Sequence, residues 1–395
     1  MIKSGVVARG IKTPIIKEGD DIVDIVVNSL METIKYEKIE LNDKDVLGIT
    51  EAVVSISAGN YATVDEIAQD MKKKYKTDHL GILFPILSRN RFQILLKAFS
   101  RAFKKLTILL SYPKDEVGNN ILDEKKLKEL NINPYSDIIT EEDYQKHFGD
   151  FRHIFTGVNM IDSYRKVALK ENCQVNFILS NNYEVIKDYT KDILVAIIHS
   201  RHQIKESLRE DKSLTVYGLD DIMNESINNS GYNKEYGLLG SNTSTDERVK
   251  LFPRKDLNML QKIQDAIKEK TGKKIEVMVY GDGAFKDPIG GIWELADPVV
   301  SPFYTDGLKG SPNEVKIKYL VDNKFGNLSG DDLTKAIKDE IRKKDNNLIG
   351  EDISLGTTPR RYVDLLGSLC DLVSGSGDKG TPVVLIQNYF NNYGE

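Results

Sequence analysis

The chain has 395 residues, of which 40% are hydrophobic and 29% charged, a composition typical of a folded globular protein. Its 55 basic and 60 acidic residues give a net charge of −5, which excludes a global attraction to nucleic acid or anionic lipid. No apolar run approaches the ~20 residues of a membrane span, and the first residues lack a signal peptide's apolar segment. Cys173 and Cys370 stand in apolar segments, so we expect buried thiols in a cytoplasmic protein. The two cysteines and five histidines show no zinc-type spacing, so a Cys/His metal site is not expected.

The first 75 residues predict alternating strands and helices. The expected elements are a strand at 5–16, a helix at 17–34, and a strand with its following loop at 45–60. The last of these places Glu51 within an apolar strand, where an unpaired carboxylate would be costly. A further helix is expected to begin after Thr63, since a threonine followed by acidic residues is typical of a helix start.

The middle of the chain, from about residue 75 to 225, predicts an α/β unit of its own. Its strands and helices are expected at 80–86, 88–105, 106–113, 176–180, 182–208 and 214–222. The first three form a strand–helix–strand series, which favours a parallel strand pair joined by a right-handed crossover. Ser88 is expected to cap the helix in that series.

The last third predicts a long loop and then further helices and strands. The expected elements are a loop at 228–253, a helix at 254–272, a strand at 273–285, helices at 331–344 and 361–375, and a strand at 381–389. Gly272 is well suited to end the first of these helices. The fold class is therefore a mixed α+β or α/β arrangement.

The stretch SGSGDKGTP at 374–382 has glycines at the spacing of a dinucleotide-binding fingerprint. In that fingerprint the glycines follow a strand and open a helix, whereas here they follow a helix and precede a strand, which excludes a Rossmann-type NAD site. Glycine N–H groups can still form an anion-binding nest, to which Lys379 would add a cation. The alternative is a glycine cap and a tight turn into an interior strand.

Several acidic and basic residues are candidates for a phosphate or metal site. Asp282 follows a strand end and Asp287 comes five positions later, and carboxylates so placed can bind Mg²⁺; an Asp-Gly turn is the alternative. Glu51 is a third possible metal ligand, unless it faces solvent on an edge strand. Arg89 and Arg91 stand at a strand–helix junction suited to phosphate or carboxylate, or else form a solvated helix start.

Five segments occur in an order that resembles the coenzyme F420-0:γ-glutamyl ligase family. They are KTPIIKEGDDI, DVLGITEAVVSISAGN, LLGSNTSTDERVKLFP, VMVYGDG and LVSGSGDKGTPVVLI. The resemblance implies a long, diverged member whose ligase core comprises 1–75 and 230–395, with 76–229 as an inserted α/β unit.

The resemblance also implies a reaction and a set of site residues. The family uses GTP with Mg²⁺ or Mn²⁺ to activate a carboxylate as an acyl phosphate, which the amine of L-glutamate attacks. The implied metal ligand is Asp282, with Asp287 and Glu51 as further candidates, and Arg89 and Arg91 are candidate catalytic cations. The implied nucleotide contacts are Thr13, Pro14, Ile15, Ile16, Asn242, Gly375, Ser376, Gly377, Asp378, Lys379 and Gly380.

The chain departs from the family pattern at several of these positions. A family lysine is replaced by Ile56, the threonine after the strand-end aspartate by Gly283, and the glutamate of the glycine loop by Ser376. Two functions therefore compete. One is an amide ligase, expected to be a homodimer, that acts on a small-molecule acceptor and L-glutamate without nucleic acid or membrane. The other is a non-catalytic nucleotide-binding or regulatory homologue that has lost the metal site.

Overall fold

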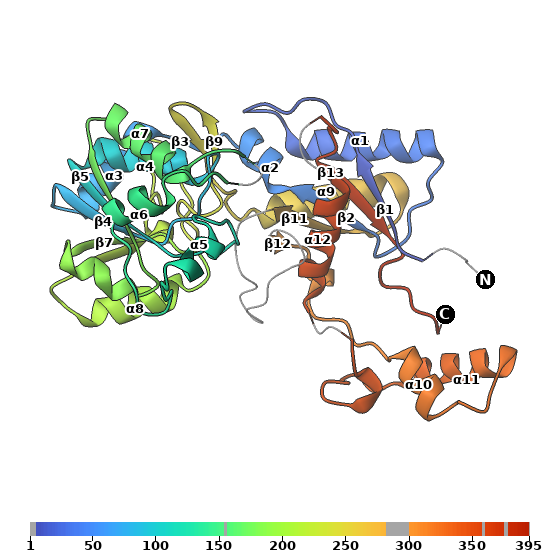
Figure 1. Cartoon of the computed structure of the whole chain (residues 1–395). Coiled ribbons are helices and arrows are strands. Elements are labelled where there is room, and N and C mark those ends of the chain that lie inside the picture. The colour runs from blue at the N-terminus through green and yellow to red at the C-terminus, as the bar shows by residue number, and fades with distance from the viewer. Residues whose placement is uncertain (1–4, 154–155, 282–299, 358–359, 375–377, 395) are drawn as a thin grey trace.

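The computed structural model describes residues 5–153, 156–281, 300–357, 360–374 and 378–394, which form three β-sheets and their covering helices. Two of the sheets have five strands and the third has three. Figure 1 shows the two larger sheets side by side, each with its own helices, and a helical segment near the C-terminus set apart from both. The mixed α/β fold class expected from the sequence is confirmed.

The first large sheet, called sheet A here, combines strands from both ends of the chain. Its order is β1 (Val7–Ile11), β13 (Val383–Gln387), β2 (Val46–Thr50), β11 (Glu276–Gly281) and β12 (Val300–Tyr304). Strands β2 and β11 are parallel, and each of the other neighbouring pairs is antiparallel. Every residue of β13 and β11 is buried, as expected for interior strands that are covered on both faces.

Alternate residues of these strands face two different helix layers. Helices α1 (Ile22–Glu37) and α9 (Leu257–Thr271) cover the face that carries Leu47 and Val277. Helix α12 (Tyr362–Ser374) covers the opposite face, which carries Val46 and Met278. It packs so closely that a β carbon at Gly48 would lie 2.4 Å from Sγ of Cys370.

The second large sheet, sheet C, is wholly parallel. Its order is β6 (Gln174–Leu179), β5 (Lys105–Leu110), β4 (His79–Leu83), β7 (Asp192–Val195) and β8 (Thr215–Gly218). Helices α3 (Val64–Lys74), α4 (Phe92–Ala102) and α7 (Met160–Lys170) share the apolar core on one face. The short helix η1 (Tyr183–Asp188) and α8 (Arg201–Glu210) cover the other face.

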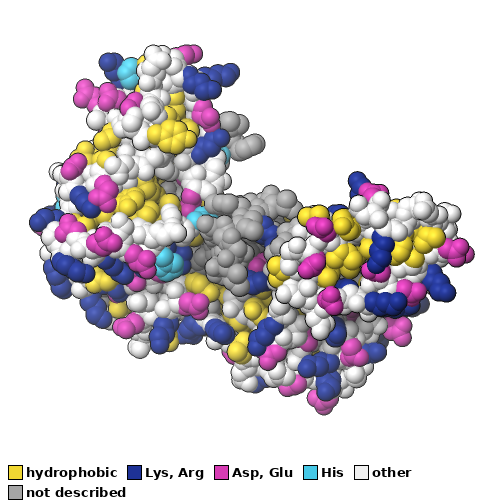
Figure 2. All heavy atoms as spheres, turned by 90° about the horizontal axis from the view of Figure 1, so that it is seen from below, with side chains coloured by type: hydrophobic (Ala, Val, Ile, Leu, Met, Phe, Trp, Pro, Cys, Tyr) yellow, Lys and Arg dark blue, Asp and Glu magenta, His cyan; other side chains and the backbone are white. Residues whose placement is uncertain are grey.

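Smaller elements connect and extend these layers. They are α2 (Glu51–Ser57), α5 (Glu124–Glu129), α6 (Glu141–Phe148), η2 (Leu219–Asp221), η3 (Asp306–Leu308), α10 (Ile317–Asn323), α11 (Gly330–Lys343) and η4 (Asp352–Ser354). The three-stranded sheet B has the order β3 (Tyr61–Thr63), β10 (Arg248–Lys250), β9 (Asn242–Thr245) and is antiparallel. On the face shown in Figure 2, acidic and basic side chains are intermixed, and apolar side chains gather over α10 and α11.

Local sequence signals predicted several of these elements correctly. Thr63 forms a capping box with Glu66 at the start of α3, and Gly272 ends α9 at a φ of 71°. The parallel pair β4 and β5, joined through α4, is also confirmed. The division into 1–75 plus 230–395 and 76–229 stays a prediction; residues 62–75 and 238–252 contribute to the core of sheet C.

Three predictions of secondary structure are wrong, in addition to the one at Glu51 that is described below. The segment 182–208, expected to be one helix, contains strand β7, because a short apolar run inside a parallel sheet has no alternation that separates it from a helix. The expected loop 228–253 contains β9 and β10. Ser88 lies before α4, which begins at Phe92, although its hydroxyl accepts from Arg91 N at 3.2 Å.

Candidate functional site

Segments from three distant parts of the chain meet at one edge of sheet A. Because β2 and β11 are parallel, their carboxyl ends lie side by side, with Tyr280 opposite Thr50. Strand β13 begins at the same edge, where Thr50 N donates to Pro382 O at 2.9 Å. We call this edge the convergent edge and define it by Thr50–Glu51, Gly281 and Gly380–Pro382.

The first predicted nucleotide-contacting segment, Thr13–Ile16, starts beside the convergent edge. Strand β1 is antiparallel to β13 and ends there, and Thr13 N donates to Gly380 O at 3.4 Å. Ile15 is 87% exposed, whereas Ile16 is half-buried against the core of sheet A. The N-terminal segment and the residues just before β13 are therefore neighbours, as a shared ligand would require.

A buried ion pair lies at the convergent edge. Lys250 Nζ donates to Glu51 Oε2 at 2.6 Å, and the two side chains are 8% and 6% exposed. The backbone of Gly281 passes directly beside this glutamate, since a β carbon at Gly281 would lie 2.2 Å from Glu51 Cγ. A larger residue at 281 would displace the carboxylate from its position beside Lys250.

The prediction that Glu51 lies within a strand is wrong. Strand β2 ends at Thr50, and Glu51 is the first residue of α2, which begins where Thr50 has extended backbone angles. An acidic residue in the first turn of a helix interacts favourably with the helix dipole. The expected cost of burying this carboxylate is offset by Lys250, which sequence reasoning missed because its segment resembled a charged surface loop.

Asn242, a predicted nucleotide contact, lies next to this pair. It is half-buried on β9, and its register partner on β10 is Lys250. Opposite residues of antiparallel strands have side chains on the same face, so Asn242 shares the face of sheet B that carries the lysine. The hairpin of β9 and β10 therefore brings a cation and an amide to the same place.

A second cation on β10 fixes the loop before α1. Arg248 donates to Glu18 Oε2 at 2.8 Å, and its guanidinium lies 3.8 Å from the centre of the Tyr61 ring. The same loop is held by Gly19 N, which donates to Ser57 O at 2.9 Å. The loop that follows Thr13–Ile16 is thereby joined to both α2 and sheet B.

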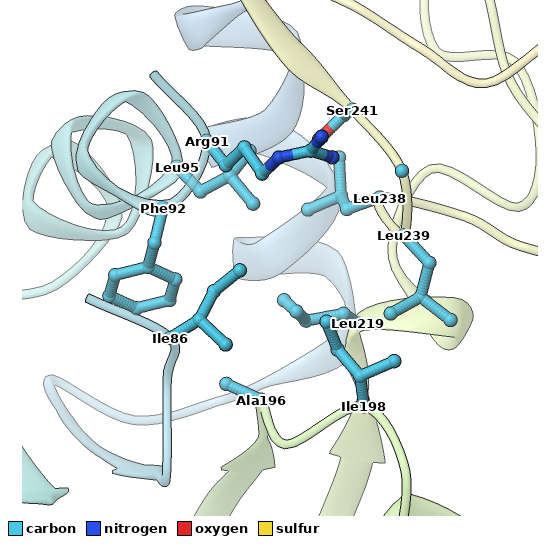
Figure 3. Close-up of a pocket in the computed structure, with 11 residues that line it drawn as sticks. Ile86, Arg91, Phe92, Leu95, Ala196, Ile198, Leu219, Leu238, Leu239 and Ser241 are labelled. Atoms are coloured by element: carbon cyan, nitrogen blue, oxygen red, sulfur yellow. The ribbon is translucent and has the colours of Figure 1, made fainter. Parts of the chain in front are cut away.

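Arg89 and Arg91 lie at the carboxyl end of β4 in sheet C, not among the residues that define the convergent edge. Arg89 is exposed, and Arg91 is half-buried and lines a small cavity (Figure 3). Their loop nevertheless reaches the β9 hairpin, because Thr243 N donates to Asn90 O at 2.8 Å. Thr243 directly follows Asn242 in the chain.

The structure describes only some of the remaining predicted site residues. Five of them lie outside the described residues: Asp282, Asp287, Gly375, Ser376 and Gly377. The described residues that precede these two segments are Gly281 and Ser374. Asp378, Lys379 and Gly380 are described and exposed. Among the described residues, no group of three His, Cys, Asp or Glu side chains could hold a metal ion.

The mixed sheet A, with a buried lysine and an amide of sheet B and a glycine-containing turn beside its strand ends, defines an α/β protein with a cluster of polar groups at that edge. The family comparison makes the assignment specific. The model of the F420-0:Gamma-glutamyl ligase family matches residues 10–388, and the chain belongs to that family. The resemblance noted from the sequence is therefore confirmed, and it extends through sheet C as well as sheet A.

The family is a ligase family, and ligases of this kind act on small-molecule substrates. No curated protein sequence matches the chain. Among the described residues, no helix has both the length and the apolar character needed to cross a membrane.

Proposed function

We propose that the protein is a GTP-dependent amide ligase that joins L-glutamate to a carboxylate acceptor through an acyl phosphate. The observation that carries the proposal is the convergent edge and the two residues that contact it: Thr13 N donates to Gly380 O, and Lys250 donates to Glu51, which lies against Gly281. The match to a γ-glutamyl ligase family supports the reaction class. GTP as the nucleotide, and Thr13–Ile16, Asn242 and 375–380 as its contacts, are part of the proposal.

We assign to Lys250 the role of stabilising the negative charge that develops on the phosphate oxygens during phosphoryl transfer. An acceptor carboxylate oxygen attacks the γ-phosphorus, the bond to the nucleoside diphosphate breaks, and an acyl phosphate forms. The amine nitrogen of glutamate then attacks the acyl carbon, phosphate leaves, and the nitrogen loses a proton. A preorganised cation in a site shielded from water stabilises such charge far better than one in solvent.

Glu51 holds the lysine in place for this role. The long Lys250 side chain would otherwise lose rotational freedom at each catalytic cycle, whereas the 2.6 Å contact fixes it beforehand. Asn242, on the facing strand, can donate to a phosphate or ribose oxygen from the same face. The chain therefore offers a charge and an orienting amide at one place.

The proposed metal, Mg²⁺ or Mn²⁺, is less well matched by the described residues. Glu51 is already bonded to an ammonium group, which would repel a divalent cation at the same oxygen. The proposal therefore assigns the metal first to Asp282 and Asp287, and no step above is routed through it. The contact between Glu51 and Lys250 also favours the alternative of a non-catalytic, nucleotide-binding homologue, because it makes Glu51 a poor metal ligand.

The test is to incubate the protein with GTP or ATP, Mg²⁺ or Mn²⁺, L-glutamate and candidate carboxylate acceptors, and to measure phosphate release. A ligase releases phosphate only when acceptor and glutamate are both present. Nucleotide binding without turnover would support the regulatory alternative. Phosphate release without any acceptor would instead indicate a nucleotide hydrolase.

A further inference from the structure

Sheet B carries a stacked pair of flat side chains close to Lys250. The guanidinium of Arg248 lies over the ring of Tyr61, with its carbon 3.8 Å from the ring centre. Arg248 and Lys250 are two positions apart on β10, and residues so spaced share one face of a strand. Tyr61 is the register partner of Lys250 on β3, so its side chain lies on this face as well.

The plane of the Arg248 guanidinium is fixed from two sides. One of its faces lies on Tyr61, and one of its edges donates to Glu18 Oε2 at 2.8 Å. Glu18 is itself held against the backbone of Gly59, where a β carbon would lie 2.8 Å from Glu18 Oε1. The Arg248 side chain is nevertheless 40% exposed, which leaves the guanidinium face opposite the ring accessible.

The acidic side chains nearest to Arg248 along the two strands are bonded elsewhere. Glu247 and Asp65 both pair with Arg101, and Glu247 also pairs with Lys97. Glu18 is therefore the carboxylate that balances the charge of Arg248. Because this carboxylate already occupies part of the hydrogen-bonding edge, the group that the arginine offers to a ligand is its flat outer face. Such a face suits a planar heterocycle.

We propose that the outer face of Arg248 is the platform on which the base of the bound nucleotide stacks. Guanidinium planes and aromatic rings are the groups on which proteins stack unpaired bases. The phosphates extend toward Lys250, which starts about 7 Å away along the same strand, a distance that the ribose between base and phosphates can span. This assignment rests on the proposed function, to which it adds a residue that binds the base.

The stacking role is tested by calorimetric titration with two probes, in Mg²⁺ and without acceptor or glutamate. The probes are GTP and inorganic triphosphate, which lacks the base and the ribose. We expect the wild-type protein to bind GTP more tightly than triphosphate. Arg248→Lys keeps the positive charge but removes the plane, so it should weaken GTP binding about ten-fold and leave triphosphate binding unchanged. Because every base has a flat face, ATP binding should weaken to a similar extent.

Variants of the supporting ring and of a second arginine–tyrosine contact complete the test. Tyr61→Phe keeps the ring and should bind GTP as the wild type does, whereas Tyr61→Leu should weaken GTP binding as Arg248→Lys does. Arg254 lies over the ring of Tyr232, with its guanidinium carbon 5.1 Å from the ring centre, away from Lys250 and Glu51. Arg254→Lys is therefore the matched control, and it should change the affinity for neither probe.

Equal GTP affinity of the wild type and Arg248→Lys overturns the proposal. An equal loss for both probes also overturns it, because Arg248 would then contact phosphate. A wild-type protein that binds triphosphate as tightly as GTP overturns the stacking role alone and leaves the phosphate site standing. Binding of neither probe contradicts the nucleotide site itself, and the stacking role with it. Thermal unfolding shows whether each variant is folded, and Arg248→Lys keeps the test available if Tyr61→Leu does not fold.

Discussion

Lys250 and Glu51 form a buried ion pair, at 2.6 Å, between a strand of sheet B and the first residue of α2. The pair joins the hairpin that carries Asn242 to the edge of sheet A where β2 and β11 end. Removing two charges from water is expensive, and the pair is seldom more stabilising than apolar residues would be. The catalytic role that we propose for Lys250 gives a reason for a charge at this position.

The first prediction separates the structural role of this pair from its catalytic role. Lys250→Met removes the ammonium group from beside the buried Glu51 carboxylate and should lower the free energy of unfolding by about 3–5 kcal/mol. The double variant Glu51→Gln/Lys250→Met removes both charges and should recover most of that stability, measured by urea denaturation. Acceptor-dependent phosphate release should nevertheless stay ~100-fold or more below wild type in the double variant.

The control for this comparison is an exposed ion pair. Lys104 and Asp78 are 80% and 67% exposed, so Lys104→Met should change the unfolding free energy by less than about 1 kcal/mol. A double variant with normal activity would show that Lys250 has only a structural role.

The second prediction concerns Gly281. Gly281→Ala places a methyl group 2.2 Å from Glu51 Cγ, so the glutamate must move away from Lys250. We expect a loss of about 1–3 kcal/mol in stability from overpacking, together with reduced turnover. Gly326→Ala is the matched control, because the nearest atom to its added β carbon is 3.5 Å away. Equal stability of the two variants would contradict the described contact.

The third prediction concerns the pH dependence of stability through Glu247, which lies in the turn between β9 and β10. Arg101 and Lys97 donate hydrogen bonds to Glu247 and hold its pKa at about 2, below the usual value. A carboxyl with a depressed folded pKa stabilises the protein above its unfolded pKa, and this contribution is lost as the pH falls toward 2. Glu247→Gln should therefore be less stable than wild type at pH 7, and the difference should shrink between about pH 4.5 and 2.

The size of that difference should be below about 1 kcal/mol, because the Glu247 side chain is 55% exposed and solvent screens the interaction. Urea midpoints of both proteins at several pH values provide the measurement. A difference that grows on acidification would contradict the assigned direction of the pKa shift.

The fourth prediction concerns the thiols. Cys173 and Cys370 are 1% and 0% exposed, and burial raises the pKa of Cys173 to about 11 and that of Cys370 still further. Both thiols are therefore protonated at neutral pH. Because only the thiolate is a good nucleophile, both should react slowly. A thiol-reactive disulfide reagent should modify neither cysteine in the native protein and both in urea. Rapid labelling of the native protein would show that one of the helices over these residues opens readily.

Local chemistry decided which parts of the fold could be predicted from the sequence. Thr63 with Glu66, and Gly272 after a long amphipathic stretch, specify helix ends through contacts within a few residues. The strand at Asp192–Val195 was missed because its identity depends on neighbours in the sheet rather than on its own alternation.

The candidate site shows the same limit. Thr13, Asn242 and Gly380 are predicted from the family resemblance, but no motif relates Lys250 to Glu51, which is 199 positions away. Their contact depends on the register of β10 against β3 and on where β2 ends, and both are long-range features. An isolated lysine between Val249 and Leu251 was the available signal, since a charge inside an apolar run is costly without a partner.

The most direct test of the convergent edge as the nucleotide site is a crystal structure of the protein soaked with GTP and Mn²⁺. We predict a triphosphate bounded by Thr13, Gly281 and Gly380, with a phosphate oxygen within hydrogen-bond distance of Lys250 Nζ and a manganese anomalous peak beside it. A nucleotide bound at sheet C instead, or a triphosphate remote from Lys250, would contradict the account.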